Sequence, residues 1–388
     1  MNVSFDIPKK VSQITQTLEN KGFSAYLVGG CVRDLVMNRK PKDWDITTDA
    51  TPEEIIKLFP KTVYENKFGT VTVVNEGIEN ESLRHIEITP FRTETKYSDK
   101  RHPDRVKFSK NIEDDLKRRD FTINALSYRV SKGQLIDLFE GVSDIKDNVI
   151  KAVGDPSERF NEDSLRILRG VRLSTELSFT INTETKEAMI KNAYLLKHIS
   201  KERIRDEVSR ITMSHQPMYG YILMQQIGIL TVIMPEIEGG IGVTQNKDHI
   251  YDVWEHSLRA LQHAALKDWP LHIRLAALFH DIGKPKTRRW NKEKNDWTFY
   301  GHEVIGAKIT ERILIDLKYP KDLVTLVVKL ARNHMFFSDI EKITLSAVRR
   351  IINKVGREDV WDLMKVRMCD RIGMGRPKEN PYRLRKYE

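Results

Sequence analysis

The feature that most constrains this chain is a run of linked pieces near its N-terminus. An apolar segment, Tyr26-Leu27-Val28, leads into Gly29-Gly30, and a short segment with Arg33 follows. The next segment predicts a strand on which Asp43 and Asp45 share a face, because alternate strand side chains point the same way. Two convergent carboxylates beside a glycine turn can hold Mg²⁺ against a nucleoside triphosphate. The run therefore predicts phosphoryl-transfer chemistry.

A pair of aspartates two residues apart has a simpler alternative, two solvated carboxylates at a strand end. The preceding Gly-Gly turn argues against it, because glycine lets backbone amides approach a phosphate closely. Arg33 could add charge-assisted hydrogen bonds to the triphosphate. Glu87, on a strand expected at residues 85–91, is a candidate third catalytic carboxylate, and an exposed strand glutamate is the open alternative.

Composition narrows the class of partner and the compartment. The 388 residues carry a net charge of +10, which favours a polyanion such as nucleic acid over a generic basic surface. Only two cysteines are present, Cys31 and Cys369, far apart and without metal-type spacing, as is typical of a reducing cytoplasm. No apolar run is long enough to span a membrane, and residues 1–10 lack the apolar core of a signal peptide.

The hydrophobic patterning predicts an α+β fold in three parts. A head over 1–150 combines a mixed sheet with helices, an all-α neck and body covers 151–245, and an all-α domain covers 246–388. A capping box at 51–54 opens a helix that runs to residue 58. A polar loop is expected at 286–298. The expected strands are 23–30, 69–74 and 85–91, and the expected helices include 11–20, 112–128, 157–177, 185–197, 204–213 and 219–227.

Two further segments could complete a nucleotide site. In the first, Asp120 could accept a ribose hydroxyl while Arg119 and Asn124 bind phosphates; a solvated helix end is the alternative. In the second, helical spacing would cluster Glu162 and Asp163 with Arg166, and an ordinary surface ion pair is the alternative.

Together these segments resemble the class II tRNA nucleotidyltransferase and bacterial poly(A) polymerase family over about the first 215 residues. The matching motifs are Gly29-Gly30-x-x-Arg33-Asp34, Asp43-x-Asp45, Arg118-Arg119-Asp120-Phe121-Thr122-x-Asn124-Ala125, Glu162-Asp163-x-x-Arg166 with Arg169 one turn later, and Glu202-Arg203-Ile204 followed by Glu207. The resemblance implies that Asp43 and Asp45 hold two catalytic Mg²⁺ ions. It also implies that Asp163 and Arg166 select the incoming base.

That base selection makes chemical sense. Cytosine and adenine both carry an exocyclic amine beside a ring-nitrogen acceptor, so a carboxylate and a guanidinium can pair with either. Guanine and uracil present a carbonyl where the amine would be, which Asp163 would repel. The loop 93–104, with Glu94, Tyr97, Arg101 and Asp104, resembles the flexible loop that the family uses to switch from C to A.

A second site is expected in the C-terminal third. His280-Asp281 ends an apolar helix, and His256, His302, His334 and Asp370 complete a set of imidazole and carboxylate ligands suited to a divalent metal. Asp339 is a weaker rival to Asp370. The pattern resembles the HD phosphohydrolase domain over about 248–375, which implies phosphatase or 2′,3′-cyclic phosphodiesterase activity at a metal whose identity stays open. A purely helical platform for tRNA is the alternative.

The resulting expectation is a cytoplasmic enzyme that adds CCA to tRNA from CTP and ATP. The head leaves two enzymatic alternatives open, an A-adding tRNA nucleotidyltransferase and a poly(A) polymerase. A third alternative is an HD phosphohydrolase with an RNA-binding head. The expected partners are tRNA and the two nucleotides, with no membrane and no protein partner.

Overall fold

The computed structural model of the chain describes residues 1–65, 69–94, 106–246, 249–335 and 344–375. The chain forms two compact units, which are treated separately below. The first comprises Met1–Arg166 with Phe179–Asn192, and the second comprises Ile167–Ser178 with Ala193–Glu388. Helix α8 (Leu165–Leu177) begins in one and continues in the other. The three-part division expected from the sequence stays a prediction.

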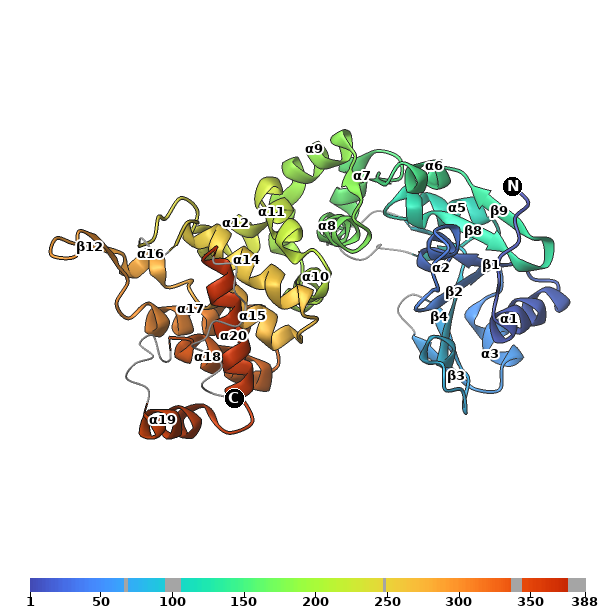
Figure 1. Cartoon of the computed structure of the whole chain (residues 1–388). Helices are drawn as coiled ribbons and strands as arrows, with labels where there is room; N and C mark the ends of the chain where they lie inside the picture. Colours follow the sequence, from blue (N-terminus) through green and yellow to red (C-terminus); the bar gives the residue numbers. More distant parts are fainter. Residues whose placement is uncertain (66–68, 95–105, 247–248, 336–343, 376–388) are drawn as a thin grey trace. The chain divides into compact units, whose positions relative to one another are not determined.

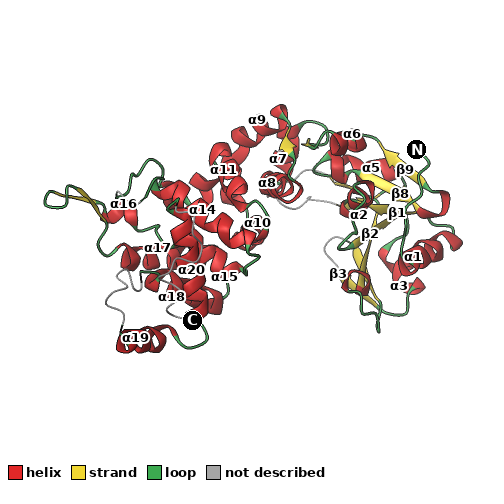
Figure 2. Cartoon of the chain, viewed as in Figure 1, coloured by secondary structure: helices red, strands yellow, loops and turns green. Residues whose placement is uncertain are grey.

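The first unit is built on a mixed seven-stranded sheet, as the patterning predicted. Its strand order is β3-β4-β5-β2-β1-β8-β9, and β2 pairs with β5 in parallel while the other pairs are antiparallel. The strands are β1 (Ala25–Val28), β2 (Trp44–Thr48), β3 (Thr62–Glu65), β4 (Thr70–Val74), β5 (His85–Pro90), β8 (Leu126–Arg129) and β9 (Gln134–Asp137). Figure 2 shows the strands gathered mainly in this unit.

The sequence places the centre of this sheet correctly. Strand β1 is buried at every position, and β4 alternates buried with half-buried residues. Helix α3 begins with the predicted capping box, in which Thr51 and Glu54 exchange hydrogen bonds with each other's backbone amides. Figure 1 follows the path of the chain through this unit. The α-helices of this unit, α3 included, are α1 (Lys9–Asn20), α2 (Gly30–Val36), α3 (Pro52–Leu58), α4 (Glu81–Arg84), α5 (Ile112–Lys117), α6 (Gly141–Lys146), α7 (Pro156–Glu162) and α9 (Thr183–Asn192).

The prediction of one helix over 112–128 was wrong beyond residue 117. Helix α5 ends at Lys117, a 3₁₀ turn covers Thr122–Asn124, and β8 then joins the sheet. The Asp120 side chain accepts a hydrogen bond from the Phe121 amide at 2.9 Å, a local bond that competes with helix. The apolar residues between 121 and 128 therefore serve a turn and a strand.

The predicted helix over 157–177 is interrupted. Asp163 has an extended backbone and ends α7, and α8 starts two residues later. Asp163 Oδ1 accepts from the Leu165 amide at 3.1 Å, so its side chain caps the second helix. Two short ladders complete the unit, β6 (Arg92–Glu94) with β7 (Val106–Phe108) and β10 (Val149–Ile150) with β11 (Thr180–Ile181).

The second unit is largely helical, as predicted. Helices α14 and α20 pack together and form its centre with α15 and α18. Its helices are α8, a 3₁₀ segment at Ala193–His198, α10 (Lys201–Met213), α11 (Pro217–Ile227), α12 (Ile229–Ile233), α13 (Pro235–Glu238), α14 (Val253–Leu266), α15 (Leu271–Phe279), α16 (Lys284–Thr287), α17 (His302–Asp316), α18 (Lys321–Asn333), α19 (Leu345–Val355) and α20 (Val360–Gly373).

The loop expected at 286–298 contains a β-hairpin instead of a structureless segment. Strand β12 (Arg289–Asn291) pairs antiparallel with β13 (Asp296–Thr298). The polar residues that suggested a loop lie mostly in the connecting turn, where Asn295 adopts a left-handed conformation. Among the described helices of the whole chain, none combines the length and apolarity needed to cross a bilayer.

Candidate functional site

Three carboxylates gather at the head sheet. Asp43 lies just before β2 and Asp45 within it, while Glu87 sits opposite Asp45 in the parallel register with β5. Burial raises the pKa of Asp45 to about 7, and the negative charges of Asp43 and Glu87 add to the effect. Asp43 and Glu87 thus disfavour ionisation of Asp45, which makes the cluster a natural site for a cation.

Gly29 brings Arg119 against this cluster. The Gly29 backbone has φ +80, in the left-handed region, and a Cβ there would lie 2.9 Å from the Arg119 NH1 and 3.9 Å from the Asp45 Oδ2. Any side chain at this position would therefore displace the arginine. The glycine turn predicted to approach a phosphate also leaves room for a guanidinium beside the carboxylates.

The predicted phosphate and ribose ligands form a connected chain. Arg33 NH1 donates to Asn124 Oδ1 at 2.9 Å, and Asn124 Nδ2 donates to Asp120 Oδ1 at 3.5 Å. Arg33 also donates to Asp34 through Nε and NH2, at 2.9 and 2.7 Å. Arg33, Asp120 and Asn124 are therefore brought together as predicted, with Asp120 buried and bonded to backbone.

Asp115, which the sequence analysis did not single out, anchors the two arginines of this segment. It is fully buried, and it accepts from Arg118 and, at 3.0 Å, from Arg119 NH2. Burial raises the pKa of Asp115, but Arg118 and Arg119 outweigh it and hold the pKa below its ordinary value. The i,i+3 and i,i+4 spacing from Asp115 was the available signal.

The predicted base-reading residues lie at the helix break. Arg166 NH1 donates to Glu162 Oε2 at 2.7 Å, and its NH2 donates to the Arg118 carbonyl at 2.9 Å. Glu162 also accepts from Arg159 at 2.5 Å. The predicted Glu162–Arg166 pair is thus present, although the helix is broken between the two residues. Arg169 follows one turn later, on the part of α8 that belongs to the second unit.

Most of the expected flexible loop lies outside the described residues, including Tyr97, Arg101 and Asp104. The same holds for Asp339 in the C-terminal part. Neither prediction is tested by the structure.

The head carboxylates fit Mg²⁺ on chemical grounds. Asp43, Asp45 and Glu87 supply oxygen donors, the ligand type that Mg²⁺ prefers. Burial first, and then the charges of Asp43 and Glu87, raise the pKa of Asp45, and a divalent cation would offset the cost of ionising this carboxylate.

A second cluster of titratable side chains lies within the helical unit. His256 comes from α14, His280 and Asp281 follow α15, His302 begins α17, His334 follows α18, and Asp370 belongs to α20. All six side chains are buried. His256 Nε2 lies 3.0 Å from Asp281 Oδ2 and 3.4 Å from Asp370 Oδ1. On the other side of Asp281, its Oδ1 lies 3.2 Å from His302 Nε2 and 3.5 Å from His334 Nε2.

Three of the histidines are oriented by the same backbone contact. The Nδ1 atoms of His280, His302 and His334 lie 2.7–2.8 Å from the carbonyl three residues earlier. Each contact assigns the proton to Nδ1 and leaves Nε2 as the atom that faces Asp281. This arrangement is typical of metal-binding histidines, whose second nitrogen is fixed by a hydrogen bond.

The two aspartates are held by cations. Lys284 Nζ lies 2.6 Å from Asp281 Oδ2, and Arg367 donates to Asp370 Oδ2. Burial opposes ionisation of both aspartates. At Asp281 the charges of His280 and Lys284 outweigh burial, and the pKa lies well below the ordinary range. At Asp370 the charge of Arg367 and hydrogen bonds from His256 and His280 outweigh burial, with the same effect on the pKa. Arg367 thereby orients Asp370 with its other oxygen toward His256 and His280.

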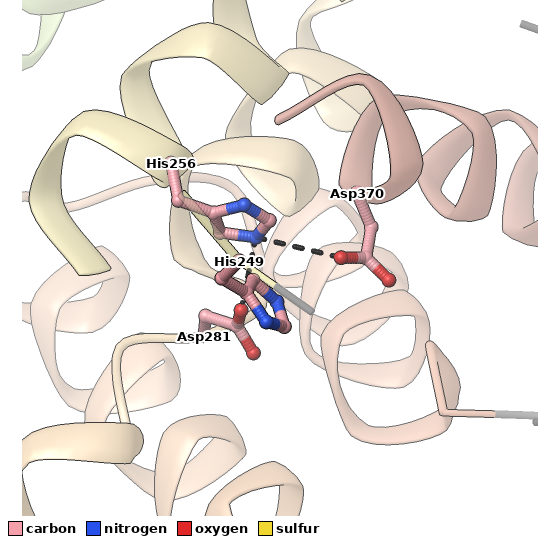
Figure 3. A group of neighbouring side chains, drawn as sticks. All are labelled: His249, His256, Asp281 and Asp370. Carbon is pink, nitrogen blue, oxygen red and sulfur yellow. Dashed lines mark ion pairs between the residues drawn. The ribbon is translucent and has the colours of Figure 1, made fainter. Parts of the chain in front are cut away.

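His249 is a member of the cluster that the sequence analysis missed. His249, His256, Asp281 and Asp370 place donor atoms within 4.8 Å of one another (Figure 3). Burial lowers the pKa of His249 to about 3, with Lys284 and His256 contributing, so the imidazole is neutral. A histidine seven residues before His256 in an irregular segment gave no periodic signal that would have identified it.

A close backbone approach brings His302 to the cluster. A Cβ at Gly283 would lie 2.2 Å from the His302 carbonyl and 2.6 Å from the Gly306 amide. Only glycine allows the turn after Asp281 to pack directly on the start of α17.

The donor set fits a divalent metal. Both oxygens of the buried Asp281 carboxylate lack a hydrogen bond of good geometry, despite the nearby nitrogens. Two overlapping groups share this residue: one with His249, His256 and Asp370, and one with His280 and His334. Mixed imidazole and carboxylate ligands suit Mn²⁺, Fe²⁺, Co²⁺, Ni²⁺ or Zn²⁺ as well as Mg²⁺.

The cluster opens into a pocket of about 850 Å³. His249, Asp281, His302 and Asp370 line its inner side. Residues of the hairpin and its flank, from Lys294 to Tyr300, line another side. The volume is within the range of small-molecule sites.

Comparison with known proteins gives three family matches along the chain. Residues 25–151 match the poly A polymerase head domain, residues 178–240 match the probable RNA and SrmB-binding site of polymerase A, and residues 253–372 match the HD domain. The head match contains Asp43, Asp45 and Glu87, and the HD match contains every member of the second cluster except His249.

Similar proteins are named CCA-adding enzymes. One from Lactobacillus helveticus (strain DPC 4571) is 50% identical over 203 residues, 52% of this chain and 49% of that protein. One from Geobacillus sp. (strain WCH70) is 46% identical over 204 residues. The chain thus spans about half the length of the curated relatives it matches. The crystal structure of the Bacillus stearothermophilus CCA-adding enzyme in complex with CTP superposes with a TM-score of 0.71 at 28% identity, covering 98% of this chain and 82% of that chain.

Proposed function

Because the chain belongs to the family of nucleotidyltransferases that carry a poly A polymerase head domain, here with an HD domain, we propose that it adds CCA to the 3′ ends of tRNA from CTP and ATP. One observation carries the proposal. The carboxylates Asp43, Asp45 and Glu87 converge beside Gly29 and Arg119, in the same unit as the Glu162–Arg166 pair.

The proposed reaction is an in-line displacement at the α-phosphorus. The 3′-hydroxyl oxygen of the RNA forms the new P–O bond, its proton is lost, and pyrophosphate departs. Bound Mg²⁺ would supply a Lewis acid for the attacking and leaving oxygens. Asp43 and Asp45, with Glu87 as the third candidate, would hold it, and Arg33, Arg119 and Asn124 would orient the triphosphate. Asp120 would accept a hydrogen bond from the ribose hydroxyl.

Base choice is assigned to Asp163 and Arg166, with Arg169 as a further nucleotide ligand. A carboxylate accepts from the exocyclic amine of cytosine or adenine, and a guanidinium donates to the adjacent ring nitrogen. Uracil and guanine would leave the carboxylate against a carbonyl, which costs a buried unpaired charge. Asp163→Ala should therefore relax base choice more than it slows nucleotide transfer. Unchanged selectivity in that variant would remove the assignment.

The test of the activity uses tRNA transcripts that end before the CCA, after C, and after CC, with Mg²⁺ and CTP, ATP or both. Extension that stops at CCA on all three transcripts supports the proposal. A single A on the CC-ending transcript alone means an A-adding enzyme, and long A tails mean a poly(A) polymerase. No extension at all would favour an HD hydrolase whose head binds RNA.

The orientation of the histidine Nε2 atoms toward Asp281 favours a second function, hydrolysis of phosphate esters at the HD cluster. We infer that His256, His280, Asp281, His302, His334 and Asp370 hold the metal. A water oxygen would bond to phosphorus, and the alcohol would leave with a proton.

Matched variants separate the two functions. Asp43→Asn and Asp45→Asn should abolish extension and leave hydrolysis, with the exposed carboxylate variant Glu53→Gln as control. His280→Ala should do the reverse, with the exposed His215→Ala as control. Extension that survives the Asp45 change would show that the catalytic carboxylates are wrongly assigned.

We also propose a domain division and a compartment. The family matches to 25–151, 178–240 and 253–372 support the division into a head to 150, a neck and body to 245 and an HD domain beyond. Two free, buried cysteines, Cys31 and Cys369, support a cytoplasmic location.

A further inference from the structure

The β12–β13 hairpin lies in the chain between two members of the HD cluster. It follows Asp281 and α16 and precedes His302, and its strands pair Arg289 with Thr298 and Trp290 with Trp297. The chain on either side of the hairpin therefore leads to a member of the cluster, Asp281 before it and His302 after it. An isolated two-stranded hairpin is marginally stable in water, so its own side chains must hold it in place.

Tryptophan packing and a stacked arginine rigidify the hairpin. The Trp290 and Trp297 rings meet edge to face at 5.2 Å, and the Arg288 guanidinium carbon lies 3.7 Å from the Trp297 ring centre. Trp290 nevertheless remains 49% exposed. Such a concentration of aromatic surface on a solvent-facing hairpin indicates a binding element more than a core contact.

One face of the hairpin forms a wall of the metal-site pocket. Lys294, Trp297 and Tyr300 line the same cavity as Asp281, His302 and Asp370. Tyr300 is 71% exposed although it lines the cavity, so its ring is not packed into the core. Lys294 Nζ donates to the Tyr300 hydroxyl at 2.8 Å and lies 5.5 Å from the ring centre, which orients the tyrosine.

The pocket combines three kinds of chemistry. Its lining includes the metal-ligand candidates Asp281, His302 and Asp370, the aromatic rings of Trp297 and Tyr300, and the cation Lys294. Lys284 and Arg367 also line it, paired with Asp281 and Asp370. A volume of about 850 Å³ exceeds the needs of a phosphate group alone. Aromatic faces beside cations bind nucleobases with attached phosphates, because every base has a face that can stack.

We propose that the β12–β13 hairpin with Tyr300 is the base-binding wall of the HD pocket, and that its ligand is a nucleoside phosphate whose phosphate points toward the metal that Asp281 and Asp370 would hold. This inference rests on the proposed phosphohydrolase function of that pocket. Tyr300 and Trp297 are its specificity-determining residues. The ligand can be a free nucleotide or the terminal nucleotide of an RNA, which share this chemistry.

The test measures binding of adenosine 3′-monophosphate and of ribose 5-phosphate to the full chain by calorimetry. Ca²⁺ takes the place of Mg²⁺ or Mn²⁺ at the cluster, and free phosphate is measured at the end of each titration to check that neither ligand has been hydrolysed. The wild-type protein should bind the nucleotide about tenfold more tightly than the sugar phosphate, the range expected for one base stack. Tyr300→Ala should abolish that difference. Tyr300→Phe keeps the ring and should keep the difference, as should Trp290→Phe, a change on the same hairpin at a residue that does not line the pocket.

Equal affinities for the two ligands in the wild type, or an unchanged difference in Tyr300→Ala, would overturn the proposal. Phosphate release with Mg²⁺ or Mn²⁺ is measured separately. Tyr300-dependent binding without any phosphate release removes the hydrolase function and leaves the hairpin assignment standing. Phosphate release combined with ligand binding that does not depend on Tyr300 removes the hairpin assignment and leaves the hydrolase function standing. A short RNA with a 3′-phosphate identifies the ligand's source: tighter Tyr300-dependent binding than the mononucleotide indicates an RNA end, and equal binding indicates a free nucleotide.

Discussion

The Arg166 guanidinium donates a hydrogen bond of 2.9 Å to the backbone carbonyl of Arg118. The residue assigned to base reading is therefore tied directly to the segment that also holds Arg119, Asp120 and Asn124. A shift of one would move the other, so the proposed base recognition and the proposed triphosphate binding would be coupled through this contact.

Asp45→Asn should abolish nucleotide addition and at the same time stabilise the metal-free protein. The pKa of Asp45 is raised to about 7, so the folded state binds a proton that the unfolded state, at the ordinary value of 3.8, has released. This group therefore lowers stability as pH rises from about 4 to about 7. Thermal unfolding at pH 8 with a chelator, monitored by circular dichroism, should show a higher midpoint for the Asp45→Asn variant than for the wild type. A lower midpoint would mean that the ionised Asp45 carboxylate does not destabilise the folded head.

Asp115→Asn should destabilise the head and weaken nucleotide binding. The change removes the charge that accepts from Arg118 and Arg119, at a cost of about 1.5–3 kcal/mol for hydrogen bonds to a charged group. Because the folded-state pKa of Asp115 is below 3.8, its contribution is present above that pH and is lost as pH falls below it. Denaturant unfolding at pH 7 and pH 3 measures this, and the difference between wild type and variant should shrink at the lower pH.

The control for Asp115 is Glu113→Gln, an exposed carboxylate on the same helix. It should leave both stability and nucleotide affinity unchanged. If the two variants behave alike, the paired arginines do not depend on the buried aspartate.

Glu162→Gln should reduce discrimination against UTP and GTP. One carboxylate oxygen of Glu162 accepts a hydrogen bond from Arg159, and the other accepts one from Arg166. A glutamine side chain has only one oxygen and so could accept from only one of the two arginines in this way. The Arg166 guanidinium would then lose part of its fixed orientation. Misincorporation on a tRNA transcript, compared with the exposed Glu158→Gln on the same helix, measures the effect. Equal fidelity in the two variants would show that Glu162 does not orient Arg166.

Gly283→Ala should disrupt the HD cluster without changing any proposed ligand. A Cβ would meet backbone atoms at 2.2 and 2.6 Å, so the start of α17 would have to move and carry His302 with it. Metal content after dialysis against Mn²⁺ should fall. tRNA extension by the head serves as the internal control and should persist. Wild-type metal content in the variant would show that His302 is not held by this contact.

The sequence indicated most of the candidate site residues, but it predicted the helix boundaries around them less well. The strand with Asp45, the Gly-Gly turn and the capping box at Thr51 follow local rules, and each is present as expected. The breaks at Lys117 and Asp163 were missed because side-chain hydrogen bonds to nearby amides decide them. Such bonds leave the spacing of apolar residues helical.

The HD cluster shows the same division. The adjacent His280-Asp281 pair at the end of an apolar helix, with the further histidines and Asp370, indicated the cluster through its residue types and its resemblance to the HD domain. His249 escaped because it lies outside a helix and reaches the cluster only through tertiary structure. The hairpin was read as a loop, since its strands are three residues long and its turn is polar.

The chain passes between its two units after Arg166, after Ser178 and after Asn192. The excursion through Phe179–Asn192 returns α9 to the first unit, where it packs on α7. The first unit is therefore assembled from two separate stretches of chain, and the second stretch supplies both α9 and β11, the strand that pairs with β10. A chain truncated at Arg166 would lack both elements, so residues 1–166 alone do not contain the whole of the first unit.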